Sequence, residues 1–135
     1  MDQEFHLYCY SQHSKEFFPS NGPSDFTNHL PKYIHLEGAW ECGLMQFKYT
    51  TTASTTEKPF YVCCDLVSES YSGDFTLPIL RRVRLRTTQF SQVIYVPLKT
   101  RDFNVVRLYL RTWKNKDSPV HRGDTHCTLH FRQIL

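Results

Sequence analysis

Hydrophobic and polar residues alternate along much of this chain, which is the pattern of β-strands. Segment 38–49 is the longest such stretch without a proline, and its bulky apolar residues make it the expected centre of the fold. Successive side chains of a strand point to opposite faces. The two faces would carry Trp40, Cys42 and Leu44 on one side and Met45, Phe47 and Tyr49 on the other. We therefore expect a central strand covered on both sides, with Gly38 and Gly43 permitting a bend or bulge where another backbone comes close.

Seven further segments show strand patterns separated by turn signals: 5–10, 25–30, 60–66, 80–86, 90–96, 103–113 and 125–132. The segment 25–30 is expected to stop at Pro31, because proline has no N–H to donate to a sheet. Residues 11–24 hold two prolines and an Asn-Gly pair and are expected to form a long loop anchored by Phe17 and Phe18.

About eight short strands, with no segment of helical periodicity, predict one all-β domain spanning residues 1–135. The expected architecture is an antiparallel β-sandwich or barrel. We expect its core to contain Trp40, Leu44, Phe47, Leu129 and Phe131.

Composition narrows the class of protein. At 135 residues the chain is long enough to bury a core, and no stretch approaches the roughly 20 apolar residues of a membrane helix. We therefore expect no membrane insertion. The net charge of +3 permits an acidic partner without requiring one.

Five cysteines have no CxxC spacing, and the polar start Met1-Asp-Gln-Glu argues against a secretory signal peptide. We therefore expect buried, reduced thiols in an intracellular compartment.

Catalytic and metal-binding patterns are weak. His126 and His130 are four residues apart on a strand, about 13 Å from each other, and Cys127 points to the opposite face. Surface histidines are the better interpretation, and we expect no metal and no cofactor. Without a GxSxG elbow or a glycine-rich phosphate loop, we expect no enzymatic activity.

The arginines at 81, 82, 84 and 86 form the clearest charge feature. Val83 and Leu85 should face inward, leaving Arg82, Arg84 and Arg86 outward. These three could bind nucleic acid or an acidic partner subunit. They could also form a solvated face that discourages edge-to-edge aggregation. Because no aromatic residues interleave with them, nucleic acid is possible but not favoured.

Aromatic residues near the start of the chain are candidates for an interface. Tyr8 and Tyr10 should lie on the outer face of the first strand, where burial against another subunit is plausible. Phe17 and Phe18 are candidates for the core or an interface, and a loop folded over its own sheet explains them better.

Several segments together resemble a known family. They are Phe17-Phe-Pro-Ser-Asn-Gly-Pro-Ser-Asp-Phe26, Leu30-Pro31, Ile34-His-Leu-Glu-Gly-Ala-Trp-Glu-Cys-Gly-Leu44, Tyr61-Val-Cys-Cys-Asp-Leu66, Pro78-Ile-Leu-Arg-Arg-Val83, Tyr95-Val-Pro-Leu98, and Gly123 followed by Thr128-Leu-His-Phe-Arg132. In this order they resemble minor capsid proteins of Polinton and adintovirus-type elements.

The resemblance implies a virion structural protein, similar to the single jelly-roll pentons that close five-fold vertices. It implies a homo-oligomer, with a pentamer favoured, that docks to a major capsid protein. The alternative is a non-enzymatic ligand- or receptor-binding β-sandwich, such as a spike head or a domesticated host adaptor. The expected location is the virion, and otherwise the cytoplasm or nucleus of the host cell.

Overall fold

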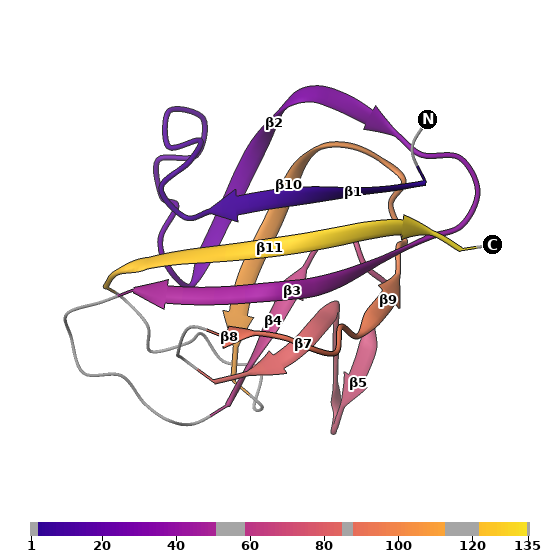
Figure 1. Ribbon diagram of the computed structural model, residues 1–135. Coiled ribbons are helices and arrows are strands. Elements are labelled where there is room, and N and C mark those ends of the chain that lie inside the picture. Colours follow the sequence, from indigo (N-terminus) through magenta and orange to yellow (C-terminus); the bar gives the residue numbers. More distant parts are fainter. Residues whose placement is uncertain (1–2, 51–58, 85–87, 113–121, 135) are drawn as a thin grey trace.

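The computed structural model describes residues 3–50, 59–84, 88–112 and 122–134, and every regular element in them is a β-strand. Figure 1 shows the strands arranged in two antiparallel sheets that lie face to face. The first sheet contains β1 (Glu4–Tyr10), β11 (Asp124–Gln133) and β3 (Trp40–Thr50), and then the short strands β8 (Thr88–Gln89) and β9 (Tyr95–Pro97), which both pair with β3. The second sheet contains, in spatial order, β2 (Asp25–His35), β10 (Asp102–Arg111), β4 (Phe60–Cys64) and β7 (Ile79–Val83). A small hairpin of β5 (Ser70–Ser72) and β6 (Phe75–Leu77) lies between β4 and β7 in the chain. The predicted all-β antiparallel fold is confirmed.

Side chains from both sheets meet in an apolar core. The five residues predicted to be buried all belong to it, each at most 2% exposed: Trp40, Leu44, Phe47, Leu129 and Phe131. The Phe131 ring of the first sheet lies 6.1 Å from that of Phe103 in the second sheet. It also stacks on Phe5 of β1 at 4.8 Å. Each such side chain contributes roughly 1.5–3 kcal/mol when fully buried.

The expected two-faced character of β3 is wrong. Gln46 pairs with Thr128 and Leu44 pairs with Leu129, so Met45 is an extra residue that forms a β-bulge. The bulge reverses the alternation, and Leu44 and Phe47 therefore both face the core. The expected close approach at Gly43 is confirmed, because a Cβ there would lie 2.4 Å from the Val93 side chain.

Pro31 does not end its strand as predicted, because it lies inside β2. Around Pro31 the pairing of β2 with β10 shifts between the pairs Ile34–Phe103 and His29–Val105. Because β2 is also an edge strand, the missing N–H of Pro31 interrupts no regular pairing.

The arginine-rich strand is shorter than predicted. β7 ends at Val83, which is buried as expected, while Leu85 and Arg86 lie outside the described residues. A register shift opposite Val62 and Cys63 brings Leu80 into the core as well.

All five cysteines are free and buried, as predicted. Burial raises the pKa of the Cys63 and Cys127 thiols to about 12. A neutral, buried thiol is a poor nucleophile, which supports a packing role for these cysteines. In the described part of the chain, no helix is long and apolar enough to cross a membrane.

Candidate interaction surfaces

The outer face of the first sheet carries stacked rings from neighbouring strands. Tyr10 pairs with His126 across β1 and β11, and their rings are parallel and 3.9 Å apart. His13 meets the Tyr10 ring edge-on at 5.1 Å. Tyr10 is half-buried by these contacts, whereas the Tyr8 side chain is 74% exposed. Of the two tyrosines predicted for an interface, only Tyr8 therefore has a large free surface in the single chain.

A second ring cluster lies farther along the same face. His130 stacks on His6 at 4.7 Å, and its Nδ1 lies 2.8 Å from the Tyr95 hydroxyl. Its Nε2 lies 3.3 Å from a carboxylate oxygen of Glu4. His130 is only 9% exposed, so its assignment as a surface histidine is wrong. The reason is that Tyr95, which is distant in sequence, covers it.

His126 is partly covered too, and its Nδ1 is buried without a hydrogen-bond partner in the described structure. Burial lowers the pKa of this imidazole, and the neighbouring Lys48 cation lowers it further. Cys127 faces the core, and His121 lies outside the described residues. Among the residues that the structure describes, no group of three or more His, Cys, Asp or Glu side chains could hold a metal ion.

Phe17 and Phe18 occupy the loop between β1 and β2. The Phe17 ring is 57% exposed and stacks on His29 of β2 at 4.7 Å, and Phe18 is half-buried. The loop therefore folds back over a sheet, as predicted, and that sheet is the second one, to which β2 belongs. Phe17 lies against the second sheet, whereas Tyr8 belongs to β1 of the first sheet, so the two rings are separate candidate contacts.

The predicted arginines line a groove at the edge where β7 and β8 lie. Its volume is about 480 Å³, and its lining includes Arg81, Arg82 and Arg84. Arg82 and Arg84 are exposed, as predicted, and Arg86 lies outside the described residues. We call this the basic groove.

Sequence reasoning included Arg81 in the charge feature but missed Phe90, the aromatic member of the basic groove. Arg81 donates a hydrogen bond to the Gln92 carbonyl at 2.6 Å, and its guanidinium lies 3.9 Å from the centre of the Phe90 ring. The groove thus has an aromatic wall, although no aromatic residue interleaves with the arginines in the sequence. Only the tertiary fold brings Phe90 there.

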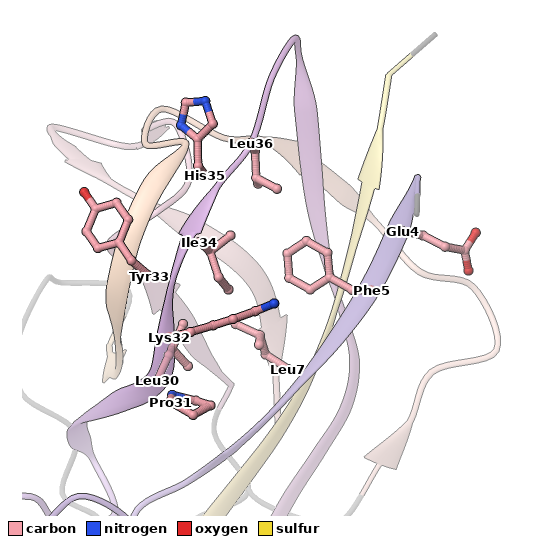
Figure 2. Close-up of a pocket in the computed structure, with 10 residues that line it drawn as sticks. All are labelled: Glu4, Phe5, Leu7, Leu30, Pro31, Lys32, Tyr33, Ile34, His35 and Leu36. Atoms are coloured by element: carbon pink, nitrogen blue, oxygen red, sulfur yellow. The ribbon is translucent and has the colours of Figure 1, made fainter. Parts of the chain in front are cut away.

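A second groove, not predicted, opens between the edge strands of the two sheets (Figure 2). It has a volume of about 680 Å³. We call it the β1–β2 groove; its apolar walls are Phe5 and Leu7 from β1, Leu30 and Ile34 from β2, and Leu36 just beyond β2. The alternation in residues 5–10 identified the inward side of β1. It could not show that the second sheet leaves part of that side uncovered.

In comparisons of this chain with family models, curated proteins and solved structures, no match is found. Function is therefore inferred from the strand arrangement and the surfaces themselves.

Proposed function

We propose that this chain is a virion structural protein: a minor capsid, penton-like subunit that self-associates and docks to a major capsid protein. One observation carries the proposal. With β8 and β9 counted as one interrupted strand and the β5–β6 hairpin left out, eight strands remain. They pair first with eighth, second with seventh, third with sixth and fourth with fifth.

This nested pairing supports a single jelly roll, in which a chain folded back on itself is rolled into two four-stranded sheets. Jelly rolls of this kind are common in viral capsids. The sequence resemblance to Polinton and adintovirus-type minor capsid proteins points to the same role. Fold alone does not determine function, so the surfaces must also suit assembly.

The positions of the surfaces favour a ring. A closed ring requires that one surface of each subunit meets a different surface of the next. β1 is the first strand of its sheet and carries Tyr8, while the basic groove lies beside β7 and β8 at the other end of the strand orders. The two candidate surfaces are therefore on different edges, as a head-to-tail contact needs.

The test is the mass of the assembled protein. Analytical ultracentrifugation at increasing concentration, alone and after co-expression with the major capsid protein of the same element, should reveal a pentamer. A subunit that stays monomeric at high concentration and also within a purified particle would contradict the penton role.

A ligand- or receptor-binding β-sandwich is the second candidate, and the β1–β2 groove favours it. An open apolar groove of about 680 Å³ lies within the roughly 300–1,000 Å³ typical of ligand sites. If the protein proves monomeric in particles, this candidate replaces the capsid role. In the capsid role the protein belongs in the virion and, before assembly, in the cytoplasm or nucleus of the host cell.

A further inference from the structure

We propose that the open edge of β1, together with the β1–β2 groove, binds an extended segment of another polypeptide as an added strand of the first sheet. The segment would place two apolar side chains, two residues apart, in the groove and would carry a carboxylate that pairs with Lys32. The site does not depend on the capsid role.

The backbone of β1 has one paired and one open side. The Ser11 amide donates to the Thr125 carbonyl at 3.0 Å, and the Gln133 amide donates to the Gln3 carbonyl at 2.9 Å. Since pairing in an antiparallel ladder alternates along the strand, the odd-numbered residues of β1 bond to β11. The N–H and C=O groups of the even-numbered residues, including His6 and Tyr8, therefore point away from the sheet.

The fold covers this open edge only at its end. The Asn28 side chain accepts a hydrogen bond from the Tyr10 amide at 2.8 Å and donates one to the Tyr10 carbonyl at 2.9 Å. This side-chain amide occupies the place of a neighbouring strand. No hydrogen bond from another described residue reaches the backbone of His6 or Tyr8 on this side.

The first part of the β2 edge, in contrast, is covered by hydrogen bonds from the loop that precedes it. Asn21 makes the same pair of bonds to Thr27, at 2.9 and 2.8 Å. Gly22 pairs with Asp25 through two backbone bonds, and the Ser14 hydroxyl accepts from the His29 amide at 2.8 Å. Exposed edges readily pair with another chain, so proteins commonly block them. Against that background, the uncovered stretch Glu4–Tyr8 is a site prepared for a strand.

The chemistry of the groove selects the added strand. Phe5 and Leu7 point inward from β1, and Leu30 and Ile34 face them from β2 (Figure 2). A strand paired with His6 and Tyr8 would direct alternate side chains into the same apolar space. Two such side chains would cover Phe5 and Leu7, which are only half-buried in the single chain.

Lys32 gives the site its charge preference. Its side chain extends from β2 across the groove toward β1 in Figure 2, and it has no carboxylate partner in the described structure. Glu4, the acidic residue of the lining, is close to His130 instead, at 3.3 Å. A carboxylate on the groove-facing side of the added strand would supply the missing partner for Lys32.

The test uses a peptide that reads the same in both directions, acetyl-Glu-Thr-Val-Thr-Val-Thr-Glu-amide, so its orientation along β1 need not be known. Its Glu and Val side chains share one face of the strand, as the groove and Lys32 require. Titrated into the full chain and followed by NMR, it should bind saturably and shift the backbone amides of His6 and Tyr8. The matched control, acetyl-Glu-Thr-Val-Val-Thr-Thr-Glu-amide, has the same composition but breaks the alternation, and it should bind at least about tenfold more weakly.

Two variants of Tyr8 separate backbone pairing from side-chain contact. Tyr8→Pro removes the outward N–H, which β11 does not use, and it should weaken binding about tenfold. Tyr8→Ala removes the same ring but keeps the N–H, and its affinity should stay within about threefold of the parent. If Tyr8→Pro fails to fold, N-methylation of the central Thr of the peptide makes the same comparison on the unaltered protein.

Lys32 is tested by a double-mutant cycle. Lys32→Gln should weaken binding of the Glu peptide by about threefold and leave binding of its Gln counterpart unchanged. The proposal is overturned if the two peptides of equal composition bind alike, or if N-methylation has no effect. It is also overturned if the protein forms a dimer that the peptide does not displace and that Tyr8→Pro abolishes. That result would show that a second copy of the chain occupies the β1 edge. Ring assembly is measured separately by sedimentation, so failure here would leave the capsid role intact.

Discussion

At the scale of single residues, Trp40 connects the core to the start of β3. Its side chain is 2% exposed, and its indole N–H donates to the Glu37 carbonyl at 2.9 Å. Phe5 packs against it at 5.7 Å between ring centres. The ring is therefore buried while its N–H keeps a hydrogen-bond partner, which is the usual arrangement for a buried tryptophan.

Trp40→Ala should lower the free energy of unfolding by about 3–5 kcal/mol, because it leaves a cavity between the sheets. A domain of this kind is stable by roughly 5–15 kcal/mol, so much of that stability would be lost. Urea denaturation followed by circular dichroism measures the change. Trp40→Phe should cost clearly less, and equal losses for the two variants would contradict the cavity explanation.

His126 should make the protein less stable in mild acid. Burial and Lys48 lower the pKa of His126 in the folded chain, whereas an unfolded histidine has a pKa of about 6.5. As the pH falls below about 6.5, the unfolded chain takes up the proton first, so the free energy of unfolding decreases. The decrease continues until the pH passes the lower pKa of the folded state.

His126→Gln should therefore flatten the fall in stability between about pH 6.5 and pH 5, as measured by denaturation at several pH values. His35 acts in the opposite direction, because hydrogen bonding to Asp102 raises its pKa, and it remains in both proteins. Asp124 opposes the shift of His126, while His13 adds to it. As a control, Lys48→Gln should reduce the acid effect in part. Parallel pH profiles for the parent and His126→Gln would refute this account.

At the scale of elements, strand positions and inward faces followed from the sequence, but bulges did not. Regular alternation correctly placed Leu129 and Phe131 on the inner face of β11. The same rule separated Leu44 from Phe47, because the extra residue at Met45 is defined only by pairing with β11. Pro31 was misread because a proline ends a central strand but is tolerated on an edge, and position in the sheet is not a local property.

For the candidate surfaces too, features of a single strand could be predicted and features made by several strands could not. Exposure of Tyr8 and Arg82 could be predicted from alternation within one strand. The aromatic wall at Phe90, the covering of His130 by Tyr95 and the β1–β2 groove depend on strands that meet only in the folded sheet. Those features could not be obtained from the residues of a single segment.

Deletion of Met45 tests the bulge. Without the extra residue, the pairs on either side of the bulge would follow one another in regular alternation, so Leu44, Phe47 and Tyr49 would keep facing the core. The deletion should therefore cost clearly less than the loss of about 3–5 kcal/mol expected for Phe47→Ala, which leaves a cavity in the core. Met45→Ala keeps the bulge and is the control for loss of the Met45 side chain. Thermal melting compares these variants, and a deletion as destabilising as Phe47→Ala would show that the bulge does not set the register.

At the scale of the whole molecule, two surfaces remain unexplained by the stability of one chain. The basic groove exposes Arg82 and Arg84 at one edge of the sandwich, and the uncovered β1 edge lies with its apolar groove at another. One is suited to acidic groups and the other to an extended apolar strand. The basic groove and the exposed Tyr8 ring on the outer face of β1 can therefore contact neighbouring subunits, while the open backbone edge of β1 pairs with a separate segment.

The role of the basic groove can be decided by a double variant, Arg82→Ala with Arg84→Ala. If the groove binds the neighbouring subunit in a ring, the variant should need at least about tenfold more protein to assemble, because each lost charge pair weakens every contact in the ring. Both side chains are exposed, so the melting temperature should change by only a few degrees. Assembly of the parent should also weaken between about 0.05 and 0.5 M salt.

The matched control is Lys48→Ala with Lys99→Ala, which removes two exposed cations outside the basic groove. It should assemble like the parent, so a loss in both variants would indicate a general effect of net charge. Binding to duplex DNA, measured at several salt concentrations, distinguishes the remaining possibility. If the arginine variant assembles normally but loses DNA binding with a shallower salt dependence, the groove contacts phosphates rather than a subunit. We expect the reverse, lost assembly with little change in DNA binding, since a net charge of +3 gives only weak general attraction to nucleic acid.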